Sequence, residues 1–414
     1  MLDSYTALPD LSLRHLKAAL VVSRTKNLTR AASQLNRSQT ALTKGIKKLE
    51  AGLGVRLFER TSCGMQPTAY CELLASSVER AERELMIAGQ AYTRYKPGAR
   101  NHKRIAMFSM EVSCKRLSAL IALHEHRDVN LAALRLGIGP PAVYKAVRES
   151  EALLEMSLFE RGPTGMTGSA YCDVLVRQLK LVFKELRQLT EDIASLRDGG
   201  ATGTVSIGTL PYSRSILTPR AINRLLEVYP ALNITTTEGP YVMQEAALRC
   251  GELDFIVGAL REGGDAGDFS TEKLLTDRLS IIARKGHPLV SRRKLQLSNL
   301  LAYHWVLPAA KTPARGLFDQ VLEAQGLDKP ERFIESSSLS MVRGLLTESD
   351  RLALLSEHQI YYERKFGQLC VLPIELPGTY RSIGITIRAR TELSIAAKAF
   401  LECLREVALE LQGV

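Results

Sequence analysis

Amides, hydroxyls and cations gather in one short segment of this sequence. The set is Thr29, Arg30, Arg37, Ser38, Gln39, Thr40, Thr43, Lys44, Lys47, Lys48 and Arg60. Amide and hydroxyl groups form hydrogen bonds with the edges of bases, and cations neutralise phosphates with release of condensed counterions. A solvated basic face would carry the same charge, so charge alone does not choose between the two interpretations. A DNA contact is predicted only if the fold presents these groups together.

The positive charge of the chain is concentrated in this segment. The 414-residue chain has a formal net charge of +11. Between Arg14 and Arg60, eleven Lys and Arg residues stand against two Glu residues, an excess of nine. This is the charge distribution that a polyphosphate ligand requires.

Apolar spacing predicts three helices that position these groups. The first is marked by Leu13, Leu16, Leu20 and Val21, the second holds Ala31, Ala32 and Leu35, and the third, over residues 39–50, turns Leu42, Ile46 and Leu49 inward. Thr29 is expected to cap the second helix and Ser38 the third. The outer face of the third helix then carries the amide, hydroxyl and lysine groups, as entry into a major groove requires. A wing is expected over residues 60–66, with Gly64 at its tip.

The first half of the chain contains an internal duplication at an offset of 101 residues. Nine of the fifteen positions in 57–71 are identical in 158–172 without a gap. Each copy is followed by a 4-3 apolar pattern. The two series are Leu74, Val78, Ala81, Leu85, Ala88 and Tyr92, and Leu175, Leu179, Val182, Leu186, Leu189, Ile193 and Leu196. Such spacing predicts two long helices, each of which pairs with another helix. The two could pair with each other, and if that pairing is antiparallel, Tyr92 arrives beside the second copy.

The second copy has diverged at the positions that would face DNA. Seven Lys and Arg residues stand against six acids between Lys115 and Arg161, an excess of one. Proline, tyrosine and glutamate replace several polar or basic groups, and the candidate contacts that remain are Tyr144, Lys145 and Arg148. The first copy is therefore expected to provide most of the DNA affinity, and the second to act as an intrachain pseudo-dimer partner.

Residues 11–71 resemble the helix-turn-helix of LysR-type transcriptional regulators, through the run AAxxLxxSQxALTxxIKKLExxLGxxLFER. The resemblance implies base and phosphate contacts from the third helix, with Arg60 beside the wing. From Gly203 onward the chain resembles the effector domain of the family. The segments GTLPYSRSILTPRAI, TEGPY, GELDFIVGALRE and ESDRLALLS are most similar to the branch that contains regulators of galactose-binding-protein genes. One helix-turn-helix per chain is usual in the family, so the duplication is the main departure.

The second half also has its own pattern, in which strands alternate with helices. Strands are expected over residues 203–209, 232–238 and 254–258, with a helix over 216–228. This alternation predicts an α/β fold with parallel strands, whose ligands lie beyond the carboxyl ends of the strands. The resemblance implies two periplasmic-binding-protein-like lobes around a cleft. Candidate effector contacts are Thr209, Tyr212, Ser213, Gly239, Tyr241, Lys311, Thr312 and Ser338. Plain helix capping or solvation explains each hydroxyl about as well, although Ser213 is also expected to cap the helix after Pro211.

The overall prediction is two all-α winged helix-turn-helix modules with long linker helices, then a two-lobed α/β effector domain. The expected segments are 1–66, 67–95, a basic loop over 96–110, 111–167, 168–198 and 203–414. Lobe I takes about 203–283 and 376–414, and lobe II about 284–375.

Function and location follow from this organisation. No catalytic motif, metal-ligand spacing or cofactor motif is visible, so an enzyme is not expected. A solute-binding protein would need a secretory signal, which the first residues do not show. A corepressor that has lost DNA contact is disfavoured by the intact first copy. The expected partners are promoter DNA, a small effector such as a sugar or an aromatic catabolite, and further copies in a dimer or tetramer, with RNA polymerase as another candidate. A cytoplasmic location without membrane contact is expected, and the seven scattered cysteines fit reduced thiols there.

Overall fold

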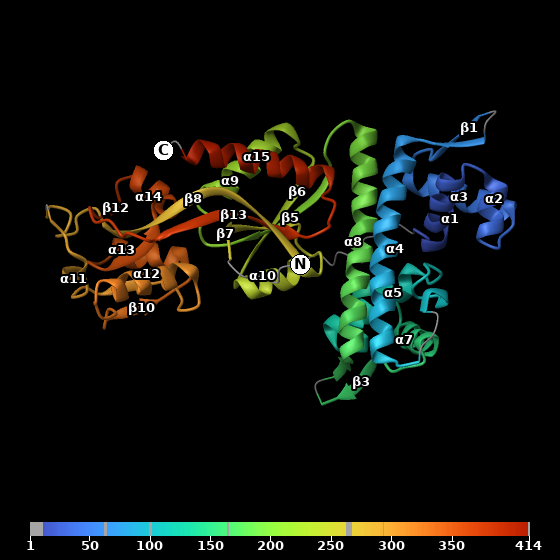
Figure 1. Ribbon diagram of the computed structural model, residues 1–414, viewed down its shortest axis with the longest axis horizontal. Coiled ribbons are helices and arrows are strands. Elements are labelled where there is room, and N and C mark those ends of the chain that lie inside the picture. Colours follow the sequence, from blue (N-terminus) through green and yellow to red (C-terminus); the bar gives the residue numbers. More distant parts are fainter. Residues whose placement is uncertain are drawn as a thin grey trace. The chain divides into compact units, whose positions relative to one another are not determined.

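The computed structural model describes residues 11–61, 64–98, 102–163, 165–261, 267–292 and 294–412. The chain forms two compact units (Figure 1). One holds the residues up to Gly203 together with Arg249–Glu252, and the other holds Thr204–Leu248 and Leu253–Val414.

The first unit begins with a helical module that ends in a hairpin. Its elements are α1 (Leu13–Thr25), α2 (Leu28–Gln34), α3 (Gln39–Leu53), β1 (Phe58–Thr61) and β2 (Gly64–Pro67). Ser38 caps α3 by accepting a hydrogen bond from the backbone N–H of Ala41, which confirms that prediction. The prediction for Thr29 is wrong, because α2 starts two residues earlier and the side chain of Asn27 accepts from Arg30 N–H. Residues 62 and 63, within the expected wing, lie outside the described residues.

The duplicated segment folds in the same order. Its elements are α5 (Cys114–His126), α6 (Val129–Leu136), α7 (Pro140–Leu154), β3 (Phe159–Gly162) and β4 (Gly165–Gly168). Both hairpins are anchored alike, since Met65 N–H donates to the carbonyl of Lys26 and Met166 N–H to that of Arg127. Gly165 is required here, because its φ is +106° and a Cβ would lie 2.3 Å from the Arg127 oxygen. The duplication therefore extends from sequence to tertiary contacts.

Two long helices, α4 (Ala69–Tyr95) and α8 (Ala170–Asp198), pack side by side and join the modules (Figure 1). They run antiparallel, because the end of α4 meets the start of α8. The Tyr171 hydroxyl donates to the carbonyl of Ala88 at 3.2 Å, and the Tyr92 hydroxyl donates to that of Leu154 in the second module at 2.6 Å. The seam is buried as far as Ile193, whereas Leu196 is 43% exposed and lies outside it.

The segment between the modules is partly core and not wholly a basic loop. After α4 a short 3-10 helix, η1 (His102–Arg104), leads into turns that bury Met107, Phe108 and Met110. The Phe108 ring lies 5.8 Å from that of Tyr92. These side chains join one apolar cluster shared by both modules, so burial of apolar surface holds the segment in place.

The second unit is an α/β domain built on a sheet in the order β10-β9-β11-β8-β13-β7-β5-β6. One half consists of β5 (Gly203–Thr209), α9 (Leu217–Val228), β6 (Leu232–Glu238), α10 (Tyr241–Arg249), β7 (Phe255–Ala259), the long β8 (Phe269–Arg284), β13 (Tyr380–Arg388) and α15 (Ile395–Gln412). Strands β5 and β7 are parallel, as the alternation predicted, but β13 pairs antiparallel with β7 and β8.

The other half is the second lobe. Its elements are α11 (Leu297–Leu300), β9 (Trp305–Leu307), α12 (Pro313–Ala324), β10 (Phe333–Glu335), α13 (Leu339–Thr347), β11 (Leu352–Ser356), η2 (Glu357–Ile360), α14 (Tyr361–Lys365) and β12 (Leu369–Val371). The strand β8 belongs to both lobes: it pairs with β13 up to Arg278 and with β11 and β12 from Leu279 onward. The two-lobed α/β prediction is confirmed, and the lobes meet a few residues before the expected boundary near 283. Among the described residues, no helix combines the length and apolarity that a membrane crossing needs.

Candidate nucleic-acid interface and effector cavity

The outer face of α3 presents the polar groups that the sequence singled out. Ser38, Gln39 and Thr40 are exposed at its N-terminal end, and Thr43 is half-buried one turn later. The Gln39 side-chain amide donates to the Thr29 hydroxyl at 3.0 Å, which links α2 to α3. The Thr43 hydroxyl donates to the carbonyl of Gln39 at 2.9 Å. The structure thus brings this part of the predicted set onto one surface.

Cations surround this surface. Arg30, Lys44, Lys47 and Lys48 are exposed, on α2 and α3. Arg37, in the turn before Ser38, forms an ion pair of 2.9 Å with Glu111. Arg60 lies in β1, and its side chain falls outside the described part of the structure. These charges also act on His15, whose pKa is lowered first by burial and then by Lys48, Arg37 and Arg14.

The corresponding face of the second module is different in chemistry. Helix α7 starts with Pro140 and Pro141, and Tyr144 is 50% exposed where the first module has Thr43. Lys145 and Arg148 are exposed. Glu149 forms a close ion pair with Arg116 and lies 3.9 Å from Lys145. The structure therefore brings Tyr144, Lys145 and Arg148 together on one helix, but with an acid among them.

A cavity of about 100 Å³ lies between the two lobes of the second unit. Its walls are mostly aliphatic and include Leu210, Ala259, Val306, Leu307, Ala314, Leu339, Val342 and Leu354. Of the eight predicted effector contacts, Tyr212 and Thr312 line it. Burial raises the pKa of the Tyr212 phenol, which stays protonated as a hydrogen-bond donor at neutral pH.

Three residues that line this cavity each carry a buried donor without a hydrogen-bond partner among the described residues: the Tyr212 hydroxyl, Nε of Arg261 and Nη2 of Arg381. The other side of the Arg381 guanidinium is held, since its Nε donates to Asp277 at 2.8 Å. Burial lowers the pKa of Arg261. Buried donors without partners are unfavourable by several kcal/mol in total (about 1–3 each), so a ligand that accepts their hydrogen bonds would gain that free energy.

Sequence reasoning missed both arginines. Arg261 follows the carboxyl end of β7, where the rule for parallel strands points, so a signal was available. Arg381 lies on the antiparallel strand β13, and no local pattern indicates that it faces the cleft.

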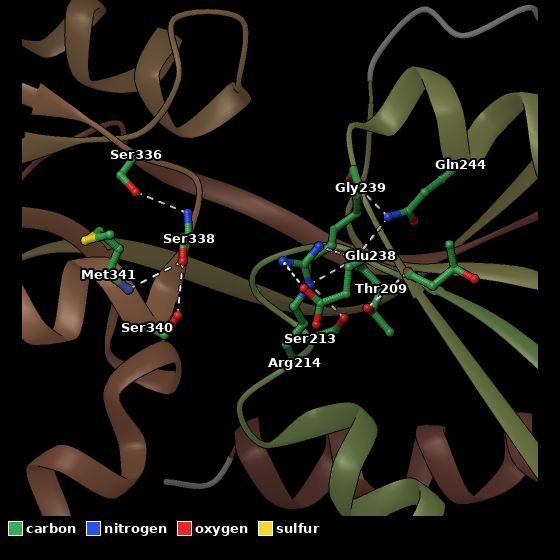
Figure 2. A network of polar contacts seen from close by, with 12 residues as sticks. Thr209, Ser213, Arg214, Glu238, Gly239, Gln244, Ser336, Ser338, Ser340 and Met341 are labelled. Carbon is green, nitrogen blue, oxygen red and sulfur yellow. Dashed lines mark hydrogen bonds and ion pairs between the residues drawn. The ribbon is translucent and has the colours of Figure 1, made fainter.

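Thr209, Ser213 and Gly239 serve the first lobe internally (Figure 2). The carbonyl of Thr209 accepts hydrogen bonds from Arg214 and Gln244, and Gln244 also donates to the carbonyl of Gly239. The capping prediction for Ser213 is wrong. Its hydroxyl is fully buried and donates to the carbonyl of Val257, because a turn separates it from α9, which begins only at Leu217.

The remaining predicted contacts lie near helix starts. Ser338 accepts a hydrogen bond from Met341 N–H and caps α13, as Figure 2 shows, and Thr312 caps α12 through Arg315 N–H. Tyr241 opens α10, and Lys311 is exposed. Capping thus accounts for Ser338, while Thr312 both caps a helix and lines the cavity.

Comparisons with known proteins agree with both parts of this description. The model of the LysR substrate binding domain matches residues 198–409, and that of the bacterial regulatory helix-turn-helix of the lysR family matches twice, at 13–72 and 114–171. The chain is 34% identical over 399 residues to the HTH-type transcriptional regulator GalR of Pseudomonas putida, a match that covers 96% of this chain and 98% of that regulator.

Other relatives match a smaller part of the chain. The regulator PcaQ of Agrobacterium fabrum is 29% identical over 74% of this chain and 98% of its own length, and GbpR of Azospirillum brasilense is 26% identical over 70% and 85%. Among solved structures, a full-length OxyR variant from Pseudomonas aeruginosa shares the fold with a TM-score of 0.52 at 23% identity, over 72% of this chain and 94% of that one. The chain therefore belongs to the LysR family of DNA-binding transcriptional regulators, with two family helix-turn-helix modules ahead of one effector-binding domain.

Proposed function

We propose that this regulator responds to a small aromatic carboxylate bound between the lobes. The observation that supports this class is the combination of aliphatic walls with the three unpaired donors of Tyr212, Arg261 and Arg381. A carboxylate accepts such hydrogen bonds strongly, and an aromatic ring fills an apolar space. A sugar is the weaker candidate, because walls that are mostly aliphatic offer few hydrogen-bond partners for its several hydroxyl groups.

Thermal shift and calorimetry on the full chain test this effector class with benzoate, 4-hydroxybenzoate and galactose as probes. A benzoate probe should raise the melting temperature, and Arg261→Gln should abolish that rise. The matched control is Lys311→Gln, which removes an exposed cation outside the cavity and should leave the rise intact. Stabilisation by galactose alone, or an Arg261→Gln variant that still responds to benzoates, would contradict the proposal.

For DNA, we propose that α3 inserts into the major groove and reads promoter bases, while the second module acts as an intrachain partner with residual backbone contact. The support is the exposed polar face of α3, which carries the exposed Lys44, Lys47 and Lys48, against the acid-containing face of α7. Gel shifts with Lys44→Ala and Lys145→Ala test the division. The loss should be clearly larger for Lys44→Ala, and equal losses would refute it.

The two sites are coupled, on this proposal, through lobe movement. Closure around the effector changes how copies of the chain pair and thereby the spacing of reading helices on the promoter. The protein would act in the cytoplasm as a dimer or tetramer and contact RNA polymerase there. Light scattering of the operator complex checks the assembly. Four chains per site would count against the idea that four modules in a dimer replace a conventional tetramer.

A further inference from the structure

The pairing surface of α4 is already occupied within the chain. Its seam residues, from Leu74 to Tyr92, are buried against α8. A buried ion pair of 2.6 Å joins Arg80 to Glu185, and the Tyr92 and Tyr171 hydrogen bonds close one end of the seam. Separating these helices would expose the apolar seam and leave charges unpaired. The helix pair is therefore a closed, intrachain interface.

An antiparallel pair of equivalent helices has an approximate two-fold axis across it. The first module lies toward one end of α4 and the second toward its other end (Figure 1). One chain thus holds two recognition-type helices, α3 and α7, in the arrangement that a symmetric dimer obtains from two chains. The symmetry of backbone and seam would suit a palindromic site.

The outer faces of α2 and α3 differ from those of α6 and α7, and this difference breaks the symmetry. At the offset of 101 residues, Arg30 and Ser33 on α2 correspond to Leu131 and Leu134 on α6, which are 51% and 76% exposed. On α7, Pro140 and Pro141 stand in place of Gln39 and Thr40, Tyr144 in place of Thr43, and Glu149 in place of Lys48. Leucine and proline side chains neither donate nor accept hydrogen bonds, so they cannot distinguish base edges in a groove as amides and hydroxyls do.

From these observations we infer that each chain reads a single half-site, so that its operator contains one block of specified base pairs per bound chain and no inverted copy under the second module. This inference rests on the proposed DNA contact of α3. A regulator with one module per chain would need two chains to form such a helix pair, and its two identical modules would read the same block twice. In this chain, one copy forms the helix pair and one module reads one block.

The test is selection of binding sequences from a random duplex pool by the full chain, combined with native mass spectrometry of the selected complex. The expected result is as many sequence blocks as bound chains. Scrambling a block should lower affinity roughly a thousandfold or more, and scrambling the flank by less than about tenfold. Two equivalent inverted blocks per bound chain would overturn the inference together with the backbone-only role proposed for the second module, and would leave the proposed base reading by α3 intact. No enriched block at all would overturn both.

A variant in which α7 regains the residue types of α3 tests the named side chains directly. Pro140→Gln, Pro141→Thr, Tyr144→Thr and Glu149→Lys together restore the α3 residue types on α7, and the folded variant should select a second, inverted block. The matched control is Thr43→Tyr, which places the α7 residue type on α3 and should weaken the single block. Circular dichroism and a thermal melt verify that both variants fold. A folded fourfold variant that still selects one block would refute the role of these residues.

Discussion

Glu111, in the segment between the modules, is expected to restrain DNA binding by the first module. Its carboxylate lies 2.9 Å from Nη2 of Arg37 and 3.1 Å from Nε of Arg14, and its carbonyl accepts two further hydrogen bonds from Arg14. Arg37 directly precedes the cap of α3, so a phosphate that binds there must compete with this carboxylate. Glu111→Gln keeps the size of the side chain and the carbonyl contacts, but it removes the negative charge.

The magnitude follows from the exposure of these pairs. The three side chains are 31–54% exposed, and pairs of this kind contribute about 0.2–1 kcal/mol each. Release of two pairs would then tighten DNA binding by about 2- to 25-fold at low salt, since about 1.4 kcal/mol corresponds to a tenfold change. One added phosphate contact would also make the slope of log K against log salt steeper by about 0.9.

Fluorescence anisotropy with a promoter duplex between about 50 and 300 mM salt measures both quantities. Glu155→Gln is the matched control, because it removes one negative charge from the second module, where Glu155 at the end of α7 forms an ion pair with Lys96 at the end of α4. The gain should appear in Glu111→Gln only, and Arg37→Ala should largely cancel it. Weaker binding by Glu111→Gln, or equal gains in the two glutamine variants, would refute the reasoning.

Three further predictions concern the stability of the first unit. The added Cβ of Gly52→Ala meets no atom within 4 Å, so this variant should raise the free energy of unfolding by about 0.5–1 kcal/mol. The Cβ of Gly45→Ala would approach the His15 side chain to 2.8 Å, which should remove that gain. Equal denaturation midpoints for the two variants would contradict this prediction. Arg80→Met should lower the free energy of unfolding by about 3–5 kcal/mol, because it leaves the buried Glu185 carboxylate without its ion pair. The double variant Arg80→Met with Glu185→Leu should recover most of that free energy. A double variant as unstable as Arg80→Met would count against a charge effect. The pKa of His15 in the folded state is depressed below 6.5, so the unfolded chain binds the proton more readily. Stability is therefore lost as the pH falls from the unfolded-state pKa through the folded-state pKa. In urea titrations between about pH 7.5 and 5, His15→Gln should lose less stability than the unmodified protein, and parallel losses would show that His15 is not responsible.

Much of the fold could be read from local patterns. The strands over 203–209 and 232–238 have the expected bounds, and Ser38 caps α3, because alternation, helical spacing and capping preferences act over a few residues. The same local logic failed by two residues at Asn27 and Thr29, where either residue type is an acceptable cap. It also placed Met107 and Met110 in a basic loop, since the charges around them hide a short buried segment.

The residues that line the cavity were harder to predict than the polar face of α3. The polar face of α3 arises from one continuous helix, so its spacing already orders Gln39, Thr43 and Lys47 along one side. The cavity is assembled from separate stretches of chain, and Arg261 and Arg381 lie 120 positions apart. No periodicity links them, because their proximity depends on how β13 pairs with β7.

The duplication, the polar face of α3 and the charge asymmetry between the copies are properties of composition and short-range order, and they follow from the chain before any folding is considered. The partner of α4 is another matter: an apolar seam buries equally well against a helix of the same chain or of another. Its antiparallel pairing with α8, the core position of Phe108 and the donors around the cavity arise from long-range packing, in which burial of apolar surface selects one arrangement among many that local preferences allow.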